Sequence, residues 1–164
     1  MMVEDEIKNL DTVNDLGNRV VSQGIQEPAG IALLKGFDFN KEALLGSIIY
    51  KPFAVNTATG EIVVANLVPQ MDVQWPQGAT HIQLTSGFVG INFETGENEL
   101  QVSASVNLPI NMDSTDVTLT PAAVPAVANT KFYLLKIEFF QQVNGVQYTL
   151  KNGLYNALRI VEVQ

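Results

Sequence analysis

The sequence predicts a mainly β protein, an antiparallel β-sandwich of the Greek-key or immunoglobulin-like type with one N-terminal α-helix. Three observations lead to this fold class. The stretch from Lys131 to Lys151 has the pattern of two strands joined by a tight turn. Roughly nine or ten short strand-like segments, separated by turn signals, are typical of sandwiches and barrels. One segment alone has helical periodicity, which disfavours an alternating β-α-β architecture.

The strongest local signal is the Asn-Gly dipeptide at 144–145. Asparagine followed by glycine tolerates the positive φ angles of a type I′ turn. Such a turn fixes the register, so that Gln141 faces Tyr148 and Glu138 faces Lys151. Side chains alternate along a strand, and one face of the first strand is therefore predicted to be core. The predicted core-facing residues are Tyr133, Leu135, Ile137 and Phe139.

Two regions are predicted, an amphipathic helix over residues 1–24 and a β-sandwich domain over residues 25–164. Apolar residues from Val3 to Val20 recur every three or four positions, as on one face of a helix. Acidic residues open this segment, and Gly24 suits its C-terminal end. Three interpretations of the stripe stay open: it packs on the β domain, it serves self-association, or it is the tail of a truncated upstream region.

The remaining chain is interpreted as strands and loops. In the strand over 99–106, Leu100 and Val102 are predicted to face the core, and Glu99 and Ser103 to face solvent. The Ala/Pro/Val loop at 121–130 is either an exposed contact patch or a cover over an open end of the sandwich. Besides the hairpin, the predicted strands are 31–39, 44–55, 61–67, 79–85, 88–93, 99–106, 116–120 and 156–163.

Composition excludes several classes of protein. The 164 residues carry 17 acidic and nine basic side chains, a net charge of −8, so binding to nucleic acid or anionic membranes is not expected. There is no cysteine for a disulfide or a thiolate. No run of about 20 apolar residues occurs, which argues against membrane insertion. The N-terminus lacks the pattern of a signal peptide, and the sequence does not indicate a cellular compartment.

Five segments carry a resemblance to known proteins. They are LLKGFDFN (33–40), YKPF (50–53), PQGATHIQL (76–84), INFET (91–95) and EFFQQVNGVQYTLKNGLYNAL (138–158). Together they resemble the C-terminal, β-rich part of a group of uncharacterised proteins from Bacteroidetes-type bacteria. The resemblance implies a β-sandwich and no assigned activity. In that group an Arg-rich helical region comes first, and its absence here favours the interpretation that this chain is a trimmed domain.

The residues needed for catalysis or metal binding are sparse. His81 is the only histidine, and no cofactor fingerprint occurs, so we predict neither an enzyme nor a bound cofactor. Asp113 and Asp116 lie in an oxygen-rich loop of the kind that calcium binds. That loop lacks the spacing of an EF-hand, and an ordinary Asx-rich turn is the favoured interpretation.

Three aromatic residues, Trp75, Tyr50 and Tyr155, are the candidate ligand-binding residues, as a platform for a sugar ring. The competing interpretation of Trp75 is a half-buried anchor. We therefore predict a non-enzymatic structural, assembly or protein-interaction module, with a protein partner or self-association. The alternative is a carbohydrate- or surface-binding module. Low charge supports the first function, since 16% of residues are charged against about 25% in ordinary soluble domains.

Overall fold

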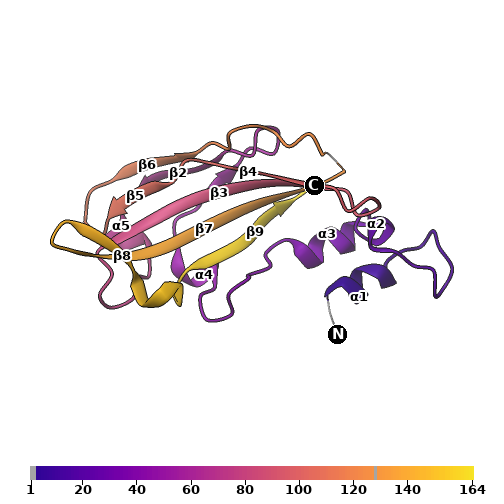
Figure 1. The fold of residues 1–164 in the computed structure, drawn as a ribbon, viewed down its shortest axis with the longest axis horizontal. Helices are drawn as coiled ribbons and strands as arrows, with labels where there is room; N and C mark the ends of the chain where they lie inside the picture. The colour runs from indigo at the N-terminus through magenta and orange to yellow at the C-terminus, as the bar shows by residue number, and fades with distance from the viewer. Residues whose placement is uncertain (1–2, 128) are drawn as a thin grey trace.

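The computed structural model describes residues 3–127 and 129–164, and shows two antiparallel sheets with short helices (Figure 1). The strands are β1 (Ala54–Val55), β2 (Ile62–Leu67), β3 (His81–Ile91), β4 (Asn98–Val102), β5 (Val106–Pro109), β6 (Thr115–Leu119), β7 (Thr130–Val143), β8 (Val146–Thr149) and β9 (Ala157–Val163). The helices are α1 (Val3–Asn9), α2 (Val21–Gly24), α3 (Pro28–Leu34), α4 (Leu45–Ile48), α5 (Pro69–Asp72) and the 3-10 helix η1 (Leu150–Gly153). The mainly β, antiparallel prediction is confirmed. The prediction of a single helix is wrong, because the described residues contain five α-helices.

The larger sheet is built on two long central strands, β3 and β7. They pair antiparallel over their length, with Ile82 opposite Phe139 and Phe88 opposite Tyr133. β4 pairs with one end of β3 and β5 with its other end. In the same way, β8 pairs with one end of β7 and β9 with the rest of it. The six strands therefore form a sheet that is four strands wide.

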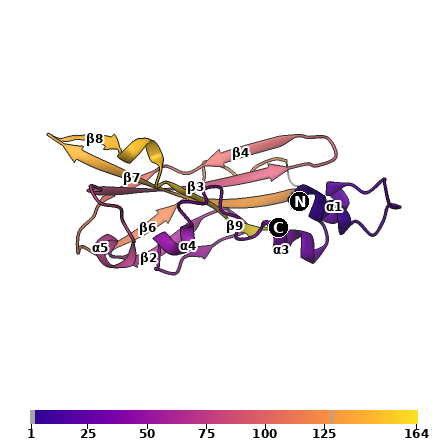
Figure 2. The same cartoon turned by 90° about the horizontal axis from the view of Figure 1, so that it is seen from below.

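The smaller sheet, in the order β1-β2-β6, covers one face of the larger sheet. Figure 2 places β2 and β6 on one side of β3 and β7, and the N-terminal helices at one end of the sheet. One apolar cluster joins both sheets and α4, and includes Ile62, Val64, Leu67, Val117, Leu119, Ile82, Leu84, Leu135, Ile137 and Phe139. Burial of this cluster is the main source of stability.

The hairpin of β7 and β8 has the predicted register. Gln141 lies opposite Tyr148, and the four residues predicted to face the core are at most 1% exposed. The turn residues Asn144 and Gly145 have φ angles of 51° and 80°, as a type I′ turn requires. The contact predicted between Glu138 and Lys151 is wrong. The strand ends at Thr149, the chain enters η1, and Glu138 pairs instead with Lys136 at 2.8 Å.

Replacing Gly145 with valine is expected to lower the free energy of unfolding by at least about 1 kcal/mol, because a β-branched residue resists positive φ. No atom lies near the missing side chain, so the effect comes from the backbone alone. Urea denaturation measures it. Asn144→Gly is the control, since glycine keeps the turn geometry. Equal stability of Gly145→Val and the wild type would contradict a type I′ turn.

The predicted helix over residues 1–24 is broken after its first part. α1 ends at Asn9, and the next residues form a loop around the buried carboxylate of Asp11. Val13 and Leu16, two members of the predicted apolar stripe, are 73% and 87% exposed. Side-chain oxygens of aspartate compete with the helix for backbone N–H groups, and this competition decides the local structure here.

The strands predicted over 31–39 and 44–55 are also wrong. Residues from Pro28 to Leu34 form α3, with proline at the first turn where its missing N–H is harmless. The second segment contains α4, and strand structure begins only at β1. Short apolar runs do not distinguish a strand from a buried helix by periodicity, and here the helical alternative is the correct one.

The facing predicted for residues 99–106 is inverted up to residue 104, whereas Val106 packs on the core and Ser105 is exposed as predicted. Leu100 and Val102 are 55% and 45% exposed, whereas Ser103 is buried. The polar side chains of β4 and the residue after it make hydrogen bonds on the inner side. Ser103 Oγ accepts the backbone N–H of Ser86 at 2.9 Å, and the carboxylate of Glu99 accepts the backbone N–H of Ala126 at 2.8 Å. The loop at 121–127 therefore lies beside this side of β4, and the apolar side faces outward.

Candidate functional site

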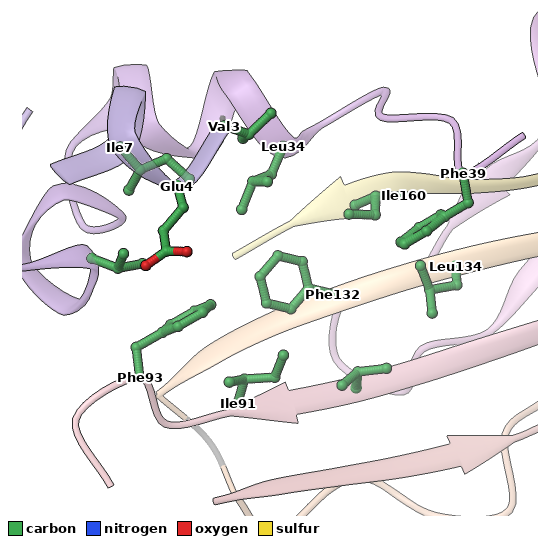
Figure 3. Close-up of a pocket in the computed structure, with 12 residues that line it drawn as sticks. Val3, Glu4, Ile7, Leu34, Phe39, Ile91, Phe93, Phe132, Leu134 and Ile160 are labelled. Carbon is green, nitrogen blue, oxygen red and sulfur yellow. The ribbon is translucent and has the colours of Figure 1, made fainter. Parts of the chain in front are cut away.

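An apolar cleft of about 660 Å³ lies between the N-terminal helices and one end of the six-stranded sheet (Figure 3). Eleven of its twelve lining residues are apolar, and the twelfth is Glu4. A volume of this size is in the range of ligand-binding clefts, roughly 300–1,000 Å³. We refer to these residues as the apolar cleft and treat it as the candidate site.

The sheet side of the apolar cleft comes from the ends of the central strands. Phe93 and Phe132 meet edge to face, with ring centres 6.2 Å apart. Near this end both faces of the strands are apolar, because Phe88 and Tyr133 point to the core while their neighbours point to the cleft. The sheet-side lining residues are Val89, Ile91, Phe93, Phe132, Leu134 and Ile160.

The other side of the apolar cleft comes from the helices. Figure 3 shows Val3, Ile7 and Leu34 above Phe132 and Ile160. Val21 of α2 adds to this wall. A backbone ladder between residues 36–39 and β9 places Phe39 at the far end of the cleft. The wall therefore depends on how α1 and α3 are held against the sheet.

Glu4 is the only ionisable residue among those that line the apolar cleft. Its carboxylate lies 2.8 Å from Nζ of Lys8, one turn further along α1. The hydrogen bond with Glu4, and then the attraction of the same carboxylate, raise the pKa of Lys8. The described lining thus combines eleven apolar residues with one charge that is paired within α1.

Asp11 shapes the loop that follows α1. Its carboxylate accepts the backbone N–H groups of Val13, Asn14 and Val20 at 2.9–3.0 Å, and the side-chain amide of Asn14 at 2.8 Å. Burial acts to raise the pKa of Asp11, but the hydrogen bonds from Asn14, Val20 and Val13 together outweigh it and hold that pKa well below its usual range. The charged form is therefore the one that closes the loop.

The contribution of Asp11 to stability is expected to depend on pH. A lowered pKa in the folded state stabilises the fold above the unfolded-state value of about 3.9, and this stabilisation is lost as the pH falls towards the folded value. Thermal unfolding of the wild type and Asp11→Asn should therefore differ most above about pH 4, and converge in acid. Asp15→Asn, an exposed neighbour, is the control. A difference that does not change with pH would contradict this role of the carboxylate.

The apolar cleft continues onto the uncovered side of the six-stranded sheet. A second depression of about 330 Å³ begins at Leu134, which lines both cavities. The missing side chain of Gly87 leaves this hollow, with Leu100, Val102 and Leu158 at its border. We call the surface formed by the lining residues of this depression the open face: Thr85, Ser86, Gly87, Leu100, Val102, Ser105, Leu134, Lys136, Glu138 and Leu158.

Two of the three predicted aromatic residues come together, away from the apolar cleft. Trp75 and Tyr155 line one pocket of about 260 Å³. Tyr50 does not line it, but its hydroxyl donates to Oε1 of Gln74, a lining residue, at 3.2 Å. Trp75, for which the competing interpretation is a half-buried anchor, is 39% exposed.

The predicted metal candidates do not converge. Asp113 accepts the side-chain amide of Asn111 at 2.6 Å and closes an Asx turn with it. Asp116 accepts the backbone N–H of Asn66 at 2.7 Å and supports an irregularity in β2. Throughout the described ranges, no three His, Cys, Asp or Glu side chains are grouped so that they could hold a metal ion.

Comparison with family models, with curated proteins and with solved structures gave no match for this chain. The resemblance to the Bacteroidetes group therefore stays a prediction. Of the helices that the structure describes, none has the length and apolar character needed to cross a membrane.

The apolar cleft was missed by the sequence prediction, although a signal for it exists. Both faces of the strand segments around Val89–Ile91 and Phe132–Leu134 are apolar, a pattern typical of strands covered on both sides. The sequence prediction assigned the apolar stripe of the N-terminal region to one long helix. Three short helices cover this end of the sheet instead, and the cleft beneath them was therefore not predicted.

Proposed function

We propose that this protein is a non-enzymatic interaction module, and that the apolar cleft and the open face together form its protein-binding surface. The observation that carries the proposal is an uncovered sheet face on which four apolar side chains lie among polar ones, and which shares Leu134 with a cleft of about 660 Å³. Contiguous exposed apolar surface of this kind marks interaction sites in soluble proteins.

A protein partner fits this surface better than a small apolar molecule does. A small ligand would fill the apolar cleft alone, and leave Leu100 and Val102 in solvent at 55% and 45% exposure. Specific protein interfaces bury roughly 800 Å² on each partner, which requires a surface that extends beyond one pocket. The open face supplies that extension.

A second copy of this chain is the partner that we propose. Sheets pack face to face at about 10 Å, and a two-fold axis would bring one open face against another. The open face carries both signs of charge, with Lys136 and Glu138 in contact at 2.8 Å, so that two copies do not repel each other locally. The net charge of −8 opposes association at long range, and added salt is expected to strengthen the dimer by screening it.

Sedimentation velocity at increasing protein concentration tests this proposal. We expect the wild type to form a dimer, and Leu100→Arg to shift it to monomer by placing an unpaired charge in the contact. Met112→Arg is the matched control, because Met112 is 59% exposed and lies outside the open face. A wild type that stays monomeric at every concentration and salt level, or an equal effect of both arginines, would overturn the proposal.

The finer fold prediction belongs to the same proposal. We propose that the two sheets form a β-sandwich of the predicted type, and the apolar cluster that they share supports it. A non-enzymatic role is supported by the lining of the apolar cleft, in which Glu4 is the one ionisable side chain.

A further inference from the structure

The pocket that contains Trp75 and Tyr155 has a different composition from the apolar cleft. Its volume is about 260 Å³, and it combines aromatic surface with three polar side chains. We call it the aromatic pocket. The polar side chains are Glu42, Ser47 and Gln74, and the aromatic ones are Trp75, Tyr155 and Phe139.

The aromatic pocket has an apolar base and accessible rings. Phe139 and Ile48 are 1% and 7% exposed, so they form a packed base that belongs to the core between the sheets. Trp75 is 39% exposed, and Tyr155 is half-buried. Trp75 therefore offers flat aromatic surface to a ligand, while Tyr155 is held by Lys151, whose ammonium lies 5.3 Å from the centre of its ring.

Hydrogen bonds between separate segments of the chain hold the walls of the aromatic pocket in place. The backbone N–H of Gln74 donates to the carbonyl of Ile48 at 2.7 Å, which joins the Trp75 segment to α4. Asn40 connects the other two walls: its amide donates to the carbonyls of Leu154 and Asn156 on either side of Tyr155, and its side-chain oxygen accepts the N–H of Glu42. Ligand binding would therefore require little reordering.

The polar side chains provide both donors and acceptors. Glu42 accepts hydrogen bonds, and Ser47 can both donate and accept. Because Oε1 of Gln74 already accepts the hydroxyl of Tyr50, the amide N–H groups are what Gln74 offers to a ligand. No basic side chain is among the described lining residues.

We propose that the aromatic pocket binds one ring of a neutral polysaccharide. A sugar ring has an apolar face of C–H groups and a rim of hydroxyls that donate and accept, and the aromatic pocket offers a counterpart to each. An apolar ligand would leave Glu42, Ser47 and Gln74 unpaired on desolvation. An anionic ligand would meet the carboxylate of Glu42, and Lys151, which lies outside the lining, already donates to the hydroxyl of Tyr155 at 3.4 Å. This site is separate from the cleft and the open face, and does not depend on their function.

Intrinsic fluorescence gives a direct measurement, because Trp75 is the only tryptophan of the chain. The full chain is titrated with laminarin, xylan, mannan and pullulan, four neutral polysaccharides. We expect at least one of them to change the Trp75 emission in a saturable way, and to retard the protein in affinity gel electrophoresis. An oligoproline peptide, which also binds aromatic grooves, is titrated in parallel.

Variants then locate the binding. Trp75→Ala is expected to weaken retardation in the gel by about tenfold or more, the loss that corresponds to ~1.4 kcal/mol. Ser47→Ala and Glu42→Gln should weaken it less, and thermal unfolding confirms that each variant is folded. Tyr148→Ala is the matched control, since Tyr148 is 58% exposed on β8 and outside the aromatic pocket. No response to any of the four polysaccharides, a response to oligoproline only, or equal binding by Trp75→Ala would overturn the proposal. Each of these results leaves the dimer measurement by sedimentation unaffected.

Discussion

Replacing Phe88 with alanine is expected to lower the free energy of unfolding by about 3–5 kcal/mol. Phe88 is fully buried and stacks on Tyr133, with ring centres 4.7 Å apart. The turn before β2 packs on this pair: Gly60 lies against the Phe88 ring, and the hydroxyl of Tyr133 donates to the carbonyl of Thr57 at 2.6 Å. Loss of the ring would leave a cavity at the point where the small sheet is attached. Urea denaturation followed by circular dichroism measures the change.

A double-mutant cycle with Gly60 separates the contact from general destabilisation. A methyl group on Gly60 would overlap the Phe88 ring, and Gly60 also has a φ of 77°. Gly60→Ala alone should therefore be destabilising through both the overlap and the backbone. In the Phe88→Ala background the two closest overlaps, with ring atoms of Phe88, are removed and only the contact with its Cβ remains, so the second substitution should be less harmful, and the two effects should not add. Strict additivity, or a loss below about 1 kcal/mol for Phe88→Ala, would contradict this packing.

The sequence was informative where local chemistry and periodicity agree. At 144–145 the Asn-Gly pair fixes the turn, and the alternation from Tyr133 to Phe139 fixes the same register independently. Both signals are local, and the structure has the predicted pairing. The same signals could not fix where β8 ends, because that depends on Lys151 and Asn152 with positive φ angles of 44° and 55°.

The prediction for the N-terminal region was wrong for the opposite reason. The structure of this region is determined by contacts between residues that are distant in the sequence. The carboxylate of Asp11 accepts the backbone N–H of Val20, nine positions further along the chain, and this hydrogen bond is not compatible with one continuous helix. On β4, the outward orientation of Leu100 follows from the loop at 121–127, which contacts Glu99 from the other side. Periodicity within a single segment carries no information on such partners, and tertiary contacts override it.

The two candidate sites also differ in how far the sequence alone identifies them. Trp75 and Tyr155 are 80 positions apart in the sequence, and their residue types alone identified them as candidates for one site. The apolar cleft is made of ordinary core residue types, and it forms only because α1, α2 and α3 are placed over the end of the sheet. Residue type therefore identified two residues of the aromatic pocket, but it also identified Tyr50, which does not line that pocket, and the cleft required the structure.

Replacing Gly24 with alanine is expected to release α1 from the fold and leave the sheets intact. Gly24 contacts the backbone of Ile7 so closely that a methyl group would overlap the Ile7 carbonyl oxygen, and Gly30 lies equally close to the carbonyl of Gly24. The three N-terminal helices thus meet backbone to backbone, and an added side chain can be accommodated only by moving one of them. Hydrogen exchange is expected to become about tenfold faster or more in α1, equivalent to ~1.4 kcal/mol, and to stay unchanged in β7.

Gly46→Ala is the matched control for this prediction, because a methyl group there would lie 3.3 Å from the guanidinium of Arg159, a much looser contact than that of Gly24 with Ile7. Unchanged exchange in α1 of Gly24→Ala would show that the helices tolerate separation. The same variant also bears on function. Val3, Glu4 and Ile7 form the α1 part of the wall of the apolar cleft, whereas no residue of α1 belongs to the open face. If both surfaces take part in self-association, Gly24→Ala should weaken the dimer as Leu100→Arg does, but through loss of the wall alone. A dimer that survives Gly24→Ala and is lost in Leu100→Arg would restrict the contact to the open face.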